Sequence, residues 1–178
     1  MNFEKLPAGQ SESFGLTDAS PAFDFSRYGK SYFRAFELSI TGRATLVLIS
    51  DSFQDGYPSK GIAVFFPVVT FLDSNKRFVG TIDWAKAPKE LRQHDVGGAY
   101  VMVSGEIPSN ASYAVVHTNA SYIGVAQNLH YRPPPQTPAV EMLEAVTGGP
   151  DTTFAVTGAP DAPGDGLDIE IDLRSGNG

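Results

Sequence analysis

The chain has 178 residues, an ordinary size for a single domain, and its eighteen glycines and thirteen prolines predict short elements joined by turns rather than long helices. The net charge of −7 and the scattered basic residues exclude a nucleic-acid partner. The absence of cysteine excludes disulfides, and the longest nearly apolar run, residues 61–72, is shorter than the roughly 20 residues of a membrane-spanning helix, so no transmembrane span is predicted.

The N-terminal part predicts an arm followed by a pair of strands. Residues 1–30 are polar and rich in turn residues, and we expect an arm with short strands there. From Ser31 to Ile40 apolar residues recur at every second position, which is the period of a half-buried strand. A turn at residues 41–43 leads into the apolar segment Thr45–Ser50, and we expect the two segments to pair as an antiparallel hairpin.

A second pair of strands is predicted after a loop at residues 51–61. The continuous apolar run Ile62–Leu72 is typical of a strand that is buried on both faces. Because proline cannot donate to a ladder, Pro67 predicts a bulge or an edge position within this run. Residues 77–84 are expected to return as the next strand, after a tight turn.

A short helical excursion and a further hairpin are predicted next. Residues 87–94 could make one or two helical turns, which the two glycines that follow would end. Ala99–Gly105 and Ala111–Thr118 are both apolar and flank a Pro-Ser-Asn turn, so we expect them to form a second hairpin.

The C-terminal part begins with a proline- and glycine-rich excursion at residues 132–164. Thr137 and the proline after it predict the start of a short helix, and Phe154–Val156 predicts a brief strand within the excursion. Residues 167–173 alternate apolar and acidic side chains, and this alternation predicts the last strand.

These elements together predict an all-β fold. Short strands in antiparallel pairs, with one or two short helices, are typical of a β-sandwich of the jelly-roll or immunoglobulin-like kind. We treat residues 1–178 as a single sandwich domain, in which loops and not a catalytic cleft form the working surface.

Residues that catalyse reactions or bind metals form no recognisable motif. His94, His117 and His130 are too far apart in the sequence to act as a closely spaced ligand pair. Gly29-Lys30-Ser31 resembles the end of a phosphate-binding loop, but Asp24 stands where the leading glycine belongs. We therefore expect no enzyme activity, no metal and no cofactor.

Acidic residues leave two weaker interpretations open. Carboxylates at strand ends could serve a glycoside hydrolase, but nothing marks two of them as a pair with separated pKa values. The acidic run from Asp161 to Asp172 could ligate calcium, but it lacks the usual loop spacing and is more typical of a solvent-exposed strand face. The carboxylates at strand ends are Asp51, Asp55, Asp73, Asp83 and Glu106.

Aromatic residues near turns are the candidates for ligand binding. Tyr57 lies in a polar loop, and Trp84 follows Asp83 at the end of a predicted strand. A sugar ring can stack on such flat groups while a carboxylate accepts its hydroxyl hydrogens, so we predict a carbohydrate site at Tyr57, Asp83 and Trp84. Core packing is the alternative, and it carries more weight for Trp84 than for Tyr57.

Five segments carry a resemblance to a known family, including a proline-containing strand that ends in a Leu-Asp turn. They are Phe36–Leu38, Leu46–Ser50, Phe66–Asn75, Tyr100–Val103 and Asp165–Ile171. In this order they resemble the maltose operon periplasmic protein family (MalM). The resemblance implies an exported protein of the Gram-negative periplasm, linked to carbohydrate uptake and without known catalytic residues.

The resemblance leads to two hypotheses about function. The first is a periplasmic, non-catalytic accessory protein for carbohydrate transport or carbohydrate binding, whose partner is an oligosaccharide or a polysaccharide. Residues 1–10 lack the basic start and apolar centre of a secretory signal, so an exported protein would be represented here by its mature part behind an added Met. The second is a structural or protein-interaction domain that docks on an envelope protein, for which residues 132–138 offer a proline-rich surface.

Overall fold

The computed structural model describes residues 2–16, 19–40, 42–51, 62–84, 86–93, 99–130, 153–158 and 169–175. Strands and short 3-10 turns make up the regular structure of this part of the chain. None of its helical segments has the length and apolar character needed to cross a bilayer. The predicted all-β sandwich is confirmed.

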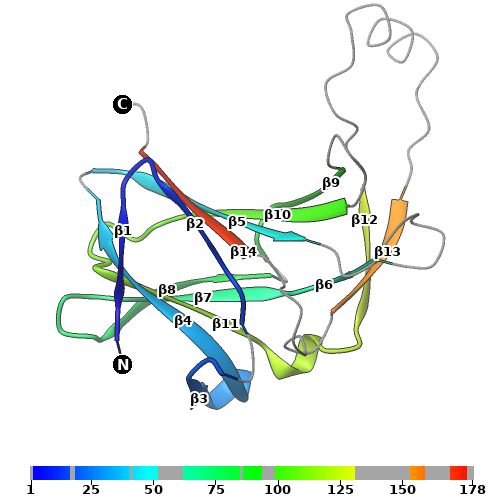
Figure 1. Ribbon diagram of the computed structural model, residues 1–178, viewed down its shortest axis with the longest axis horizontal. Helices are drawn as coiled ribbons and strands as arrows, with labels where there is room; N and C mark the ends of the chain where they lie inside the picture. Colours follow the sequence, from blue (N-terminus) through cyan, green and yellow to red (C-terminus); the bar gives the residue numbers. More distant parts are fainter. Residues whose placement is uncertain are drawn as a thin grey trace, which may run out of the picture.

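Two mostly antiparallel sheets pack face to face, and a small third sheet stands at one end of them (Figure 1). Sheet A contains, in spatial order, β1 (Glu4–Pro7), β4 (Lys30–Ser39), β11 (Tyr113–Thr118), β7 (Pro67–Leu72) and β8 (Phe78–Asp83), with β3 (Ala22–Asp24) also paired to β4. Sheet B contains β2 (Ser11–Phe14), β14 (Ile169–Ser175), β5 (Ala44–Asp51), β10 (Ala99–Glu106) and β9 (Lys89–Gln93). The third sheet contains β12 (Ala126–His130), β13 (Thr153–Gly158) and β6 (Ile62–Val64).

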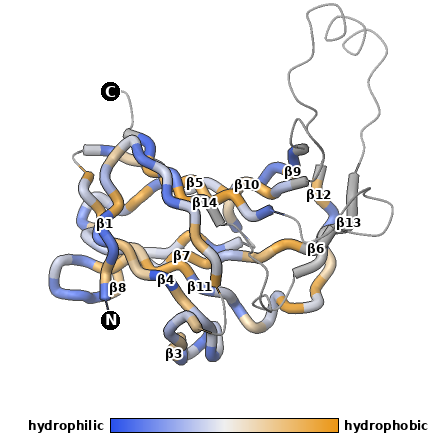
Figure 2. The backbone as a smooth tube through the Cα atoms, in the orientation of Figure 1, coloured by the Kyte–Doolittle hydropathy of each residue, from blue (hydrophilic) through white to orange (hydrophobic). Residues whose placement is uncertain are grey.

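The facing sides of sheets A and B enclose one hydrophobic core. Alternating residues of β4 and β7, such as Phe36 and Phe71, meet Leu48 and Ile171 of sheet B in this core. Figure 2 shows the apolar course of β7 and the polar turn that joins it to β8. Leu6 and Leu173 also belong to the core, so strands near both ends of the chain close the same interior.

Two glycines allow close packing where β8 meets sheet B and the turn after β10. A Cβ atom on Gly105 would lie 2.7 Å from Cγ1 of Ile82, and one on Gly80 would lie 2.8 Å from Cγ of Pro108. Both distances are too short for a real Cβ contact, so these positions require glycine for steric reasons.

Both predicted hairpins are wrong, because their strands lie in different sheets. β4 belongs to sheet A and β5 to sheet B, and the same is true of β11 and β10. A short polar turn between two apolar strands fits a hairpin within one sheet and also a connection that crosses between two sheets. Here each connection crosses, so that the apolar faces of the two strands lie opposite one another across the common core. The strand predicted at residues 77–84 is confirmed as β8. It pairs with β7 in antiparallel fashion, with a register shift between Phe71 and Leu72.

The predicted strand at residues 62–72 is divided in two. β6 joins the third sheet, and Pro67 begins β7, a position where a strand tolerates the missing N–H. Between them the backbone N–H of Phe65 donates to Oγ of Ser50 at 3.0 Å, which satisfies a buried donor outside any ladder.

Residues 89–93 form β9 and not the expected helical turns. One or two helical turns have little stability of their own, whereas β9 pairs with β10 and buries Leu91 in the core. The predicted strands near the C-terminus are confirmed as β13 and β14, while the helix predicted from Thr137 falls outside the described residues.

We expect Gly105→Ala to lower the free energy of unfolding by about 1–3 kcal/mol, because the new methyl group overlaps the Ile82 side chain. Urea denaturation measures this loss. In an Ile82→Ala background the methyl group has room, so the same substitution should then cost little. An equal loss in both backgrounds would show that the Ile82 contact is not its cause.

Candidate functional site

Sheet A is apolar on its outer face as well as on its inner face. Phe33, Ala35 and Val115 form a second buried cluster there, separate from the main core. Phe3 and Phe25, both from the N-terminal arm, pack against this cluster. The arm therefore removes from water a sheet face that would otherwise expose large apolar side chains.

His117 lies on this outer face and is fully buried. It stands directly opposite Phe33 of β4 on one side and Val68 of β7 on the other. The ring of Phe25 stacks on the imidazole with 3.8 Å between ring centres and 4° between planes. Tyr28, in the 3-10 turn η1 (Ser26–Tyr28), closes a further side with its ring centre 5.3 Å away.

The hydrogen bonds of His117 define one neutral tautomer. Its Nδ1 lies 2.8 Å from the carbonyl oxygen of Thr118, and its Nε2 lies 3.0 Å from Oγ1 of Thr70. Since a carbonyl oxygen can only accept, Nδ1 carries the hydrogen and Nε2 accepts from the Thr70 hydroxyl. Burial lowers the pKa of His117 to about 4, while the Thr118 carbonyl and the Asp83 carboxylate oppose this shift only in part. The ring is therefore uncharged near neutral pH.

A hollow of about 410 Å³ opens on the outer face beside this histidine. Its size is in the range of small-ligand sites. Two of the rings around it, Phe23 and Phe78, are 53% and 60% exposed, so their faces are accessible. The lining comes from β3, η1, β7 and β8, and consists of Phe23, Asp24, Phe25, Ser26, Arg27, Tyr28, Thr70 and Phe78.

Charged groups from the turn around η1 add polar contacts to this apolar hollow. Oδ1 of Asp24 accepts from the backbone N–H of Ser26 at 2.9 Å. The guanidinium of Arg27 lies 4.5 Å from the ring centre of Tyr28 and donates to the hydroxyl of the same residue. The backbone of Ser26 has a φ of 56°, an uncommon conformation for a residue with a side chain and one that is often found at functional sites. The hollow thus combines aromatic faces with one carboxylate and one guanidinium.

The structure gives Trp84 a role in packing. Its side chain is fully buried, and its ring stacks on Phe66 with 4.1 Å between ring centres. Its Nε1 donates to Oε1 of Gln127 at 3.0 Å, which links the end of β8 to the third sheet. The predicted stacking of a sugar on Trp84 does not fit this burial, because no face of the indole is open to solvent.

Asp83 belongs to the same junction between sheets, and Tyr57 lies outside the described residues. Oδ1 of Asp83 accepts from the hydroxyl of Tyr122 at 2.6 Å, in the 3-10 turn η3 (Ala120–Tyr122). Nζ of Lys89 donates to the carbonyl oxygen of Trp84 at 2.6 Å. Burial lowers the pKa of Lys89, and the nearby Asp83 carboxylate opposes this shift. The sequence neighbours Asp83 and Trp84 are thus both engaged in contacts within the chain.

The residues of the hollow escaped the sequence analysis. Phe23 and Phe25 are two positions apart in a polar arm, a spacing that places them on one side of an extended segment and could have marked them as a pair. No sequence signal indicates that this arm folds onto β7 and β11, because that contact joins distant parts of the chain.

Comparisons with protein-family models, with curated proteins and with solved structures find no match to this chain. In the described ranges, no group of three or more acidic or histidine side chains is arranged to hold a metal ion. The hollow and its residues therefore have to be interpreted from their own geometry.

The buried His117 predicts that the fold loses stability in mild acid. Its pKa is about 4 in the folded chain and about 6.5 in an unfolded one, so between these values only the unfolded chain binds the proton. The free energy of unfolding should therefore fall as the pH is lowered from 6.5 to 4, by at most about 3 kcal/mol from this group.

Urea denaturation of the native chain and of His117→Gln, at several pH values in this interval, measures the contribution. The difference in stability between the two proteins should shrink as the pH falls. A difference that does not change with pH would show that His117 keeps an ordinary pKa in the fold.

Proposed function

We propose that this chain is a non-catalytic accessory protein of the Gram-negative envelope, located in the periplasm, which binds carbohydrate in the service of carbohydrate transport. The observation that carries the proposal is the hollow on the outer face of sheet A, where two exposed phenyl rings stand beside a carboxylate and a guanidinium. The resemblance of five sequence segments, in their order along the chain, to the maltose operon periplasmic protein family supports the compartment and the link to transport.

The composition of the hollow suits a sugar better than a fully apolar ligand. A pyranose ring presents C–H groups on its faces and hydroxyls around its edge, so it needs flat apolar partners and hydrogen-bonding groups at the same place. Phe23 and Phe78 supply accessible ring faces. Asp24 can accept from hydroxyls and Arg27 can donate to them, and both line the same hollow.

The geometry around His117 supports binding in preference to catalysis. Its imidazole lies beneath Phe25 and is fully buried, and both of its nitrogens already have partners. The side chain of His117 instead stabilises the lining of the hollow, because its Nε2 accepts from the hydroxyl of Thr70 and so joins β11 to β7.

Phe78→Ala should weaken carbohydrate binding at least about fivefold, because it removes a stacking face from the hollow. Ile123→Ala is the matched control, since Ile123 is also an exposed apolar residue, 43% accessible, but does not line the hollow. Isothermal titration calorimetry with a panel of oligosaccharides measures the effect. Binding that survives Phe78→Ala unchanged would place the sugar elsewhere, and a panel without any binder would contradict the proposal.

A further inference from the structure

We infer that the ligand of this hollow is an acidic glycan, in which the carboxylate of a uronic acid pairs with Arg27. This inference rests on the proposed function, and it names the class of carbohydrate. It predicts that the protein distinguishes a uronic acid from a neutral sugar of the same shape.

Arg27 is the first part of the argument. It is exposed and lines the hollow, and no carboxylate within the described part of the chain forms an ion pair with it. Its guanidinium is held over the ring of Tyr28 and donates to the hydroxyl of that residue. A planar cation whose orientation is already restricted loses less freedom on binding, and guanidinium geometry matches a carboxylate.

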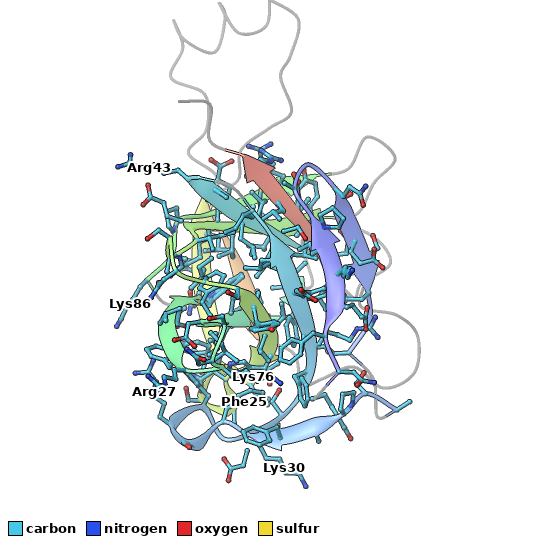
Figure 3. All side chains as sticks on the ribbon, turned by 90° about the vertical axis from the view of Figure 1, so that its left-hand side faces the viewer. Phe25, Arg27, Lys30, Arg43, Lys76 and Lys86 are labelled. Carbon is cyan, nitrogen blue, oxygen red and sulfur yellow. The ribbon has the colours of Figure 1, made fainter. Side chains whose placement is uncertain are left out.

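The second part is the charge balance around the hollow. Asp24, the one acidic side chain among the described residues that line the hollow, stands directly opposite Lys30 in the pairing of β3 with β4. Cross-strand neighbours of opposite charge compensate one another, which leaves the charge of Arg27 in excess. Figure 3 places Arg27, Lys30 and Lys76 toward the same end of the molecule, although the chain as a whole carries a net charge of −7. Since Lys30 is already balanced by Asp24, the charge of Arg27 is the one that favours an anionic ligand in the hollow.

The third part of the argument is Thr70, whose hydroxyl hydrogen is already used in a hydrogen bond to His117. The neutral tautomer of His117 accepts the Thr70 hydroxyl hydrogen at Nε2. Thr70 can therefore offer a ligand only the lone pairs of its oxygen, at the floor of the hollow. An acceptor at the floor and a cationic donor in η1 match a ring that carries hydroxyls on one part and a carboxylate on another.

A neutral glycan would use this arrangement only in part. Its ring could still stack on Phe23 and Phe78, but the charge of Arg27 would gain no opposite charge on binding. A uronic acid adds the charge pair without any change in ring size. The preference for acidic over neutral ligands should therefore depend on Arg27, while the basic affinity depends on the aromatic rings.

The test compares matched ligands by calorimetry. Oligomers of galacturonate, glucuronate and guluronate are titrated into the protein beside their methyl esters, which keep the ring and lose the charge. We expect at least one acid to bind about tenfold more tightly than its ester, and we expect this preference to decrease with added salt.

Arg27→Gln tests the residue itself. It should reduce the affinity for the acid by about tenfold, to near that for the ester, and change the affinity for the ester much less, because only the acid loses a charge pair. Arg43→Gln is the matched control, because Arg43 is an exposed arginine at the opposite end of the molecule in Figure 3. It should retain the preference.

The outcomes separate this inference from the proposed function. If acids and esters bind equally, or if the preference survives Arg27→Gln, the assignment of an acidic glycan is wrong while carbohydrate binding stands. If neither acids, nor esters, nor neutral oligosaccharides bind, both are wrong.

Discussion

The architecture depends on one constraint, which is that the central strands of sheet A are apolar on both faces. In β4, Phe36 points into the core between the sheets, while Phe33 and Ala35 point to the other side. In β11, Val116 and Val115 divide in the same way. A sandwich of two sheets covers only one face of each, so the fold needs a further layer over the outer face of sheet A.

The N-terminal arm supplies that layer, and the candidate site results from how it does so. Phe25 and Tyr28 enclose the imidazole of His117, and Phe25 also packs on the second apolar cluster. The buried histidine remains neutral and hydrogen bonded, as a polar group must in such surroundings. Because the arm covers this face only in part, a hollow is left between η1 and β8. The segment that covers this face thus also supplies part of the proposed binding surface, together with Thr70 and Phe78 of sheet A.

Asp83 and Trp84 were predicted from the sequence to bind a sugar, but in the fold they lie at the junction of the three sheets. A sugar ring can stack on a tryptophan while a neighbouring carboxylate accepts its hydroxyl hydrogens. In this fold Trp84 donates a hydrogen bond to Gln127, and Asp83 accepts one from Tyr122. Both side chains therefore connect the end of β8 to the segments that follow β11. The same residue types serve a binding surface and a buried polar joint, and only their partners distinguish the two.

The all-β class, the two-face burial of β7 and the positions of most strands follow from the sequence alone, because side-chain alternation is a local property of the chain. The pairing of those strands is not local. A turn such as residues 41–43 is compatible with a hairpin and with a crossing between sheets, and the difference is settled by which apolar faces meet in the core. The hollow likewise needs Phe23, Arg27 and Phe78 from separate elements. The tertiary structure alone decided the candidate site, because it depends on contacts between distant segments that local patterns do not encode.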